Sequence, residues 1–239
     1  MIIDIHTHLM PGVDDGASDM SVSVKMMNMA SVEGTVCIAL TPHFLQGFYE
    51  VPIKSMIEKL NILNELAEEK SINIKFCCGN EVYITDDLPK LLEEKKVLTI
   101  NGSRYLLIEF PLLDMPFYTD NIIFKLMTKG YVPIIAHPER NVMLSSDIKL
   151  VKKLVEQGVL MQINGGSITG KYGKSACRSA NNIVKSGLAH FIASDAHSDS
   201  YKRPGLNKAR ENIEKNFGEE TADKLFYRNP LAVINNEII

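Results

Sequence analysis

Short apolar runs rich in β-branched residues alternate along the chain with longer segments whose apolar residues recur every three or four positions. The runs have the pattern of buried strands, and the spaced segments have the pattern of amphipathic helices. The runs predict seven strands, at residues 2–5, 35–40, 74–78, 105–108, 132–136, 160–163 and 191–193. The spaced segments predict helices at residues 20–33, 52–70, 86–95, 118–129, 147–157 and 174–185, with one or two more within 206–226.

This regular alternation is typical of a parallel sheet whose helices lie outside it. We expect an α/β fold in the form of a closed, TIM-like (β/α)7 barrel of seven strands. An open dinucleotide-binding sheet is less favoured, because no glycine fingerprint follows the first strand. No linker or low-complexity segment interrupts residues 1–239, so we expect one domain.

Composition narrows the class of protein. Of the 239 residues, 45% are hydrophobic and 23% are charged, which favours a globular chain over a disordered one. The net charge of -3 offers no global electropositive surface for nucleic acid. No apolar run is long enough for membrane insertion and no signal peptide begins the chain, so we expect a cytoplasmic location.

The four cysteines do not indicate redox or cysteine-phosphatase chemistry. They show no C-x-x-C spacing, and we interpret them as reduced packing residues. No cysteine is followed six positions later by arginine, so the phosphate loop of the cysteine-dependent tyrosine phosphatases is absent.

Histidine and carboxylate residues collect at the predicted carboxyl ends of the strands. In the first strand, His6 and His8 are two residues apart and therefore project from the same face. Asp14 and Asp15, in the loop after Pro11-Gly12, could bring a carboxylate oxygen to the same rings. The later strand ends add His43, Glu81, Glu109, His137, Asp195 and His197.

A parallel barrel places all these strand ends on one rim, so eight or nine potential metal ligands converge there. This number exceeds the first shell of one ion, which predicts two or three divalent metals with Glu81 as a natural bridge. Taken singly, each residue could instead be a turn cap, a solvated loop residue or a packing residue. His190 begins the seventh strand, on the opposite rim, and is expected to be structural.

Two arginines lie in loops on the same rim. Arg140 follows three residues after His137, and Arg203 follows six residues after His197. A guanidinium recognises phosphate oxygens in a planar, bidentate manner, which suggests a phosphate ester as substrate. Each arginine could instead pair with a ligand carboxylate.

The motifs H-T-H followed by V-D-D-G, then T-P-H, G-N-E, H-P-E-R and S-D-A-H, resemble those of the polymerase and histidinol phosphatase (PHP) superfamily. Within it, the closest resemblance is to the bacterial CpsB/CapC-type capsular and exopolysaccharide tyrosine-protein phosphatases. The motifs run from Asp4 to Arg203, essentially the whole chain. The resemblance implies a distorted seven-stranded barrel, a trinuclear centre usually active with manganese, and hydrolysis of phosphotyrosine.

The resemblance also implies how the ligands are shared. One ion would be held by His6, His8, Glu81 and Asp195, and a second by Glu81, Glu109 and His137. A third would be held by Asp15, His43 and His197, where spacing favours Asp15 over Asp14. Iron or zinc could replace manganese, because histidine and carboxylate ligands accept several ions.

The expected mechanism is attack of a metal-activated hydroxide on phosphorus, with Arg140 and Arg203 binding the non-bridging oxygens. His43 or His197 could assist departure of the tyrosine, whose pKa of about 10 already makes it a good leaving group. By resemblance, the protein partner is a bacterial tyrosine autokinase that controls exopolysaccharide production, and oligomerisation is possible.

Three alternatives remain open. The same metals could serve a small-molecule phosphoesterase such as a histidinol phosphatase, although mostly short loops favour an open site for a protein substrate. The domain could be a noncatalytic or proofreading appendage of a polymerase, for which the chain has little room. It could also be a metal-storage module, although storage would not require phosphate-binding arginines.

Overall fold

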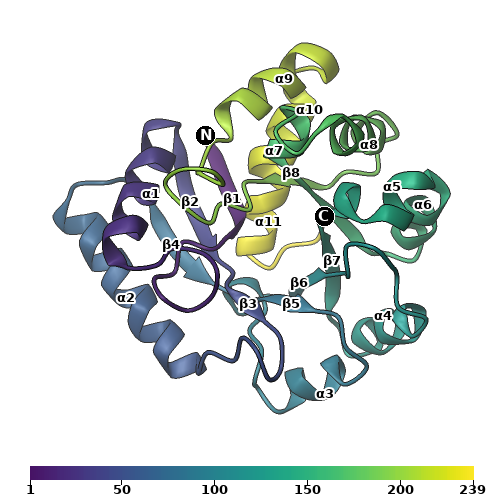
Figure 1. Ribbon diagram of the computed structural model, residues 1–239, viewed down its shortest axis with the longest axis horizontal. Coiled ribbons are helices and arrows are strands. Elements are labelled where there is room, and N and C mark those ends of the chain that lie inside the picture. The colour runs from purple at the N-terminus through teal and green to yellow at the C-terminus, as the bar shows by residue number, and fades with distance from the viewer.

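The computed structural model describes residues 1–239, whose strands form two parallel sheets surrounded by helices (Figure 1). One sheet has three strands in the order β1-β2-β4, and the other has six in the order β3-β5-β6-β7-β8-β9. The strands are β1 (Ile2–Thr7), β2 (Thr35–Leu40), β3 (His43–Phe44), β4 (Lys75–Cys78), β5 (Glu81–Tyr83), β6 (Tyr105–Glu109), β7 (Val132–Ala136), β8 (Leu160–Asn164) and β9 (Phe191–Ala193).

The α/β class and parallel strands agree with the sequence prediction, but the hydrogen bonds do not form one closed barrel of seven strands. The predicted strands at 35–40 and 74–78 are each followed, after a short break, by an additional strand that belongs to the other sheet. Pro42 has no N–H to donate between β2 and β3, and Gly79 and Asn80 separate β4 from β5. The interruptions bring β3 beside β5, with His43 opposite Glu81.

The free edges of the two sheets, β1 and β9, are connected by few contacts between β1 and the segment after β9. Thr7 and Ala196 form an isolated parallel bridge, and the backbone N–H of Asp195 donates to the carbonyl of His6. Inside the two sheets, one buried cluster takes residues from β1, β2, β4, β6, β7, β8 and β9, including Ile5 and Leu107.

The long helices lie outside the strands (Figure 1). They are α1 (Met20–Val32), α2 (Ile53–Glu69), α4 (Thr119–Thr128), α6 (Ile148–Glu156), α8 (Lys174–Lys185) and α9 (Asn207–Phe217). Shorter elements are α3 (Leu88–Glu93), η1 (Ile100–Gly102), η2 (Pro138–Arg140), α5 (Val142–Ser146), α7 (Gly165–Ile168), α10 (Glu219–Asp223), η3 (Lys224–Arg228) and α11 (Asn229–Ile234). None of the helices combines the length and apolar character needed to cross a membrane.

The six helices predicted before residue 186 are confirmed, the third as the six-residue α3, whereas the tail has more helix than predicted. Instead of one or two closing helices within residues 206–226, four elements run from α9 to α11 and end at Ile234. The residues after α11 bind the amino-terminal side of β6: the Tyr105 hydroxyl donates to the carbonyl of Glu237, and Arg104 donates to Asn236.

Candidate metal centre

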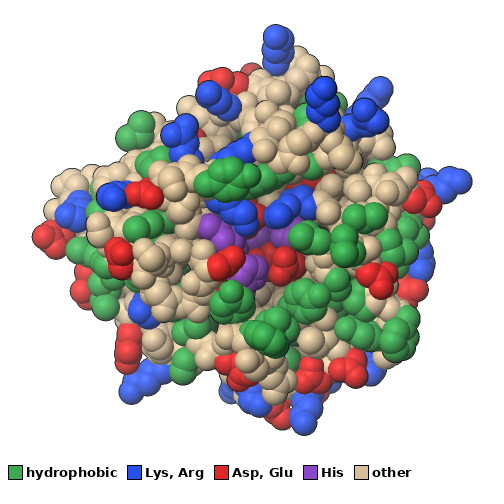
Figure 2. Space-filling model, viewed as in Figure 1, with side chains coloured by type: hydrophobic (Ala, Val, Ile, Leu, Met, Phe, Trp, Pro, Cys, Tyr) green, Lys and Arg blue, Asp and Glu red, His purple; other side chains and the backbone are tan.

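The nine predicted metal ligands meet at one end of the strands, where Figure 2 shows histidine and acidic side chains at the bottom of a hollow. His6 lies in β1, His43 begins β3, Glu81 begins β5 and Glu109 ends β6. The others follow the ends of strands: His8 follows β1, His137 follows β7, and Asp195 and His197 follow β9. Asp15 lies in the loop between β1 and α1, so both sheets contribute to the cluster.

Glu81 is the centre of this arrangement. Its Oε2 atom lies 3.1 Å from His6 Nε2, 3.2 Å from His8 Nε2 and 3.0 Å from His43 Nδ1. Its Oε1 atom lies 3.1 Å from His137 Nε2. Oε2 is fully buried yet has no hydrogen bond of acceptable geometry. A buried carboxylate oxygen without such a bond needs another partner, and a shared cation would meet that need.

The outer nitrogens of His6 and His8 are both occupied by hydrogen bonds. His6 Nδ1 lies 2.7 Å from Gln162 Oε1, and His8 Nδ1 lies 2.7 Å from Asp14 Oδ2. The two inner Nε2 atoms are consequently the free ones, and they are only 3.2 Å apart. Two imidazole nitrogens this close cannot both carry a proton, so a bound cation fits the space that they face.

A chain of amides connects His6 to Asp195. Gln162 Nε2 donates to Asn164 Oδ1 at 2.9 Å, and Asn164 Nδ2 donates to Asp195 Oδ2 at 2.8 Å. Each amide therefore has one assigned orientation, which leaves Gln162 Oε1 to accept from His6 Nδ1. The sequence prediction missed both amides, although they stand two residues apart at the one strand end without a predicted ligand.

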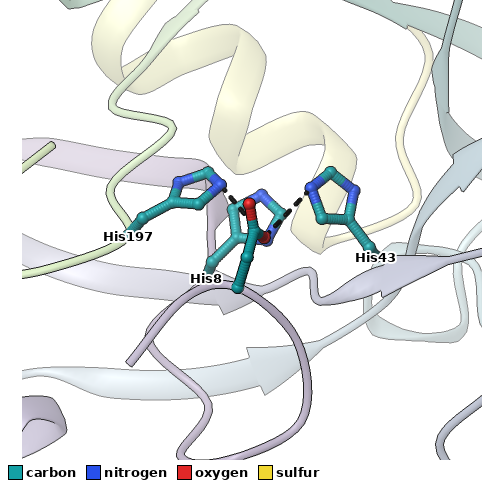
Figure 3. A group of neighbouring side chains, drawn as sticks. His8, His43 and His197 are labelled. Carbon is teal, nitrogen blue, oxygen red and sulfur yellow. Dashed lines mark ion pairs between the residues drawn. The ribbon is translucent and has the colours of Figure 1, made fainter. Parts of the chain in front are cut away.

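Asp15, His8, His43 and His197 form a second group of converging atoms (Figure 3). Asp15 Oδ1 lies 3.4 Å from His43 Nε2 and 3.6 Å from His197 Nε2. Asp14 instead accepts from His8 and, at 3.0 Å, from the backbone N–H of His43. This geometry favours Asp15 as the ligand and gives Asp14 the role of holding the His8 ring.

The remaining ligands complete a third group with His43 and Glu81. Glu109 Oε2 lies 3.7 Å from His43 Nδ1, and Glu109 Oε1 lies 3.6 Å from His137 Nε2. Burial and the neighbouring Glu81 raise the pKa of Glu109, which shows that negative charge is crowded here. Crowded carboxylates among imidazoles favour binding of divalent cations.

Two of the site residues have left-handed backbone conformations. His137 has φ = 34° and Asp195 has φ = 52°, values that residues other than glycine rarely adopt. Each such residue costs on the order of 1–3 kcal/mol and is common at functional sites. The turns aim both side chains back toward Glu81 and His6.

Two cations stand beside Asp195. Arg140 Nη1 donates to Asp195 Oδ2 at 3.2 Å, and the guanidinium lies over the Tyr172 ring, 5.1 Å from its centre. Lys202 Nζ lies 3.7 Å from Asp195 Oδ2 and 3.3 Å from His197 Nε2. The sequence prediction included Arg140 but missed Lys202 and Tyr172, which carry no motif of their own.

Electrostatics differ between the members of the site. Burial opposes ionisation of Asp195, but the nearby His6, His137 and Lys202 lower its pKa below the usual range. Burial lowers the pKa of His197 to about 3, with His8 and Lys202 acting in the same direction. A neutral imidazole has a lone pair for a metal, so His197 suits a ligand at neutral pH.

Arg203 is not brought into this network. Its side chain is exposed and lines a neighbouring pocket together with Lys171, Tyr172 and Lys208. His190 lies just before β9, on the opposite side, where its Nδ1 accepts from the N–H of Met161 at 3.1 Å. The structural role expected for His190 agrees with this contact.

Exposed apolar side chains stand on the loop that follows Glu109. Leu113 is 79% exposed and Phe117 is 99% exposed. Figure 2 shows hydrophobic side chains on one side of the histidine hollow and lysine and arginine side chains above it. The centre is therefore open to the surface and is bordered by both apolar and cationic groups.

Comparisons with known proteins find relatives that match nearly the whole chain. The family model for capsular polysaccharide synthesis proteins, CpsB/CapC, matches residues 2–235. A putative tyrosine-protein phosphatase CapC from Staphylococcus aureus is 37% identical over 238 residues, which cover 100% of this chain and 93% of the relative.

Solved structures give a similar result. The match to the crystal structures of YwqE from Bacillus subtilis and CpsB from Streptococcus pneumoniae, described as unique metal-dependent tyrosine phosphatases, has a TM-score of 0.95 and 34% identity. It covers 100% of this chain and 96% of the other. A histidinol phosphate phosphatase from Lactococcus lactis has a TM-score of 0.55 and 13% identity, covers 90% and 94%, and shares the fold alone.

Proposed function

The chain belongs to the CpsB/CapC family, and on this premise we propose that it is a metal-dependent tyrosine-protein phosphatase that acts in capsular polysaccharide synthesis. The observation that carries the proposal is the fully buried Glu81 Oε2, which has no hydrogen bond although three imidazole nitrogens lie 3.0–3.2 Å away. Such an oxygen has the surroundings of a bridging metal ligand.

The residues present fit two or three divalent ions. We assign one ion to His6, His8, Glu81 and Asp195, and a second to Glu81, Glu109 and His137. We assign a third to Asp15, His43 and His197, and expect manganese, with iron or zinc as alternatives. Bound ions of this kind supply Lewis acidity that ionises water near neutral pH and neutralises charge on a phosphoryl group.

The chain's own residues would bind and orient the phosphate. Arg140 is held by Asp195 on one side and by the Tyr172 ring on the other, so its guanidinium is already oriented. Its remaining N–H groups can donate to non-bridging oxygens as charge shifts during the reaction. The phosphate contact predicted for Arg203 stays a prediction, and would require its exposed side chain to turn toward Arg140.

Of the two histidines expected to assist the leaving group, His43 fits better as a proton donor. Burial opposes protonation of His43, but Glu81 raises its pKa, whereas the pKa of His197 is lowered to about 3. A His43 ring that is not bound to the third ion could deliver a proton to the departing tyrosine oxygen, whose pKa is about 10. With all three ions bound, His43 and His197 would both act as ligands.

The surroundings of the centre favour a protein substrate. A tyrosine on a polypeptide needs an open approach, and the exposed Leu113 and Phe117 offer apolar surface for the residues that flank it. The alternative, a small-molecule phosphoesterase such as a histidinol phosphatase, would need no such surface. We expect the substrate to be a bacterial tyrosine autokinase, met in the cytoplasm.

We also propose that the two sheets work as one distorted seven-stranded barrel. The interior cluster draws on all seven predicted strands, and the Thr7–Ala196 bridge connects the first strand with the segment after the last. These contacts support a common rim for the nine ligands.

The test is hydrolysis of a phosphotyrosine peptide and of histidinol phosphate by chelated protein with and without added manganese. We expect manganese-dependent turnover of the peptide. His137→Ala should lower kcat/KM by more than about 100-fold, since a ligand is lost. His190→Gln, which changes a histidine outside the centre, should retain activity. Preference for histidinol phosphate would overturn the assigned substrate. If neither compound is hydrolysed, the proposal that the protein is a phosphatase is wrong.

A further inference from the structure

A pocket of about 150 Å³ lies beside the candidate metal centre. Its wall includes three cationic side chains, those of Lys171, Arg203 and Lys208, together with Tyr172 and Ser194. A phosphate or carboxylate group fits this space.

The three cations of the pocket outnumber its single carboxylate, that of Glu33. None of Lys171, Arg203 and Lys208 forms an ion pair with a carboxylate. The one acidic residue in the wall, Glu33, accepts a hydrogen bond from the backbone N–H of Asn207 at 3.1 Å. Partial burial lowers the pKa of Lys171, and its neighbours Arg203 and Lys202 lower it further, as expected for crowded like charges.

Three connections place this pocket next to the metal centre. Ser194 lines the pocket, and the next residue, Asp195, faces the metal ligands. Arg203 lines the pocket, and the preceding residue, Lys202, contacts His197. Tyr172 forms part of the pocket wall and also lies under Arg140. The pocket and the metal centre are therefore adjacent.

Resting on the proposed function, we propose that this pocket is an anion subsite for the substrate polypeptide. It binds a carboxylate or a second phosphate carried by a residue close to the phosphotyrosine. An extended chain advances about 3.3 Å per residue, so the anion belongs to a residue within about three positions of the phosphotyrosine. Lysine and arginine donate charge-assisted hydrogen bonds to either group, and binding there relieves the repulsion among the cations.

The experiment compares three phosphotyrosine peptides of equal length that differ at one position near the phosphotyrosine: glutamine, glutamate or phosphoserine. We expect KM for the glutamate and phosphoserine peptides to be about three- to tenfold lower than for the glutamine peptide, with similar kcat. The preference should weaken as salt screens the contact. A lower KM for both anionic peptides indicates that a carboxylate is sufficient for binding. A lower KM for the phosphoserine peptide alone indicates a phosphate subsite.

Charge reversal separates binding from a structural effect. Lys171→Glu and Lys208→Glu should abolish or invert the preference for the anionic peptides, seen in KM and not in kcat. Lys149→Glu provides a matched control, because Lys149 is an exposed lysine on α6, outside the pocket, and should leave the preference intact.

The outcomes distinguish this inference from the function on which it rests. Equal KM for all three peptides at low salt, with normal turnover, would overturn the subsite and leave the phosphatase standing. A preference that survives both charge reversals would also overturn it. Failure to hydrolyse any of the peptides would overturn the phosphatase and the subsite together.

Discussion

The His8 ring is held from both ends of its imidazole. Asp14 accepts from Nδ1 at 2.7 Å, while Nε2 faces His6 and Glu81. Asp14 itself accepts from the backbone N–H groups of Gly16 and His43, so its two oxygens have only donors around them. Asp14, which is not among the proposed ligands, therefore fixes the orientation and tautomer of His8, which is one of them.

Replacing Asp14 by asparagine should weaken metal binding. The new side-chain amide would place its NH2 group against N–H donors, and the substitution would remove the charge that makes His8 a stronger ligand. We expect a fall of about 10- to 100-fold in metal affinity, the range for partners of ligating histidines, measured by competition with a chromophoric chelator. Asp19→Asn is the control, since Asp19 caps α1 and asparagine caps equally well. Unchanged affinity in Asp14→Asn would refute this role.

His190 should make the protein less stable in mild acid. Burial and Lys224 lower its pKa to about 4 in the folded state, against about 6.5 in the unfolded chain. Between these values the unfolded chain binds more protons, so the free energy of unfolding decreases as the pH falls. The loss is about 2 kcal/mol at pH 5. Protonation of Nδ1 also breaks its bond from the N–H of Met161.

The measurement is the urea midpoint at pH 7 and pH 5, with chelator present, for the protein and for His190→Gln. The decrease between the two pH values should be smaller in the variant, because glutamine does not titrate. Equal decreases in both proteins would show that His190 does not contribute.

At the scale of elements, the breaks between β2 and β3 and between β4 and β5 set the positions of His43 and Glu81. β3 begins with His43 only because Thr41 and Pro42 separate it from β2, and β5 begins with Glu81 after Gly79 and Asn80. The backbone at Gly79 passes so close to η1 that an added Cβ would lie 2.9 Å from the Cα of Ile100. The absence of a side chain permits this approach.

Gly79→Ala should destabilise the fold and displace Glu81. The clash is with backbone, which cannot yield as a flexible side chain would, so we expect a loss of about 1–3 kcal/mol in the free energy of unfolding. Gly205→Ala is the control, because its Cβ would meet nothing nearer than 3.7 Å. Denaturant midpoints and manganese affinity measure the two effects. Equal midpoints for both variants would contradict the prediction.

The sequence predicted the elements that are long and patterned, and missed those that are not. Two-residue β3 and three-residue β5 are too short to show a period, and a proline or glycine beside them indicated only the end of a strand. The clustering of the histidines and carboxylates could be predicted because they follow recognisable strands. Gln162, Asn164 and Lys202 could not, because their roles depend on contacts with residues distant in the sequence.

At the scale of the whole molecule, the candidate centre joins the two sheets. His6 belongs to the three-stranded sheet, whereas His43, Glu81 and Glu109 belong to the six-stranded one. Few backbone contacts connect β1 with the segment after β9, so ions shared between these ligands would reinforce a weakly paired side of the fold.

Removal of metal should therefore lower the melting temperature. Ions present at 100 times their dissociation constant stabilise the folded state by about 2.7 kcal/mol per site. For a chain of this size each site then contributes roughly 5–10 °C to the decrease on chelation, which manganese should reverse. His8→Ala should lose most of this metal-dependent shift. The protein must first be shown to contain manganese. Identical melting curves with and without chelator would then rule out that bound ions stabilise the contact between the two sheets.

The span of the ligands along the chain also bears on how the protein is made. The ligands run from His6 to His197, so the centre is incomplete until most of the polypeptide has left the ribosome. The amino-terminal strands emerge and begin to fold first, before the residues that would share ions with His6 and His8 have been made. On the proposed ligand set, metal would be acquired by a nearly finished chain, and a product that ends before residue 195 would lack Asp195 and His197.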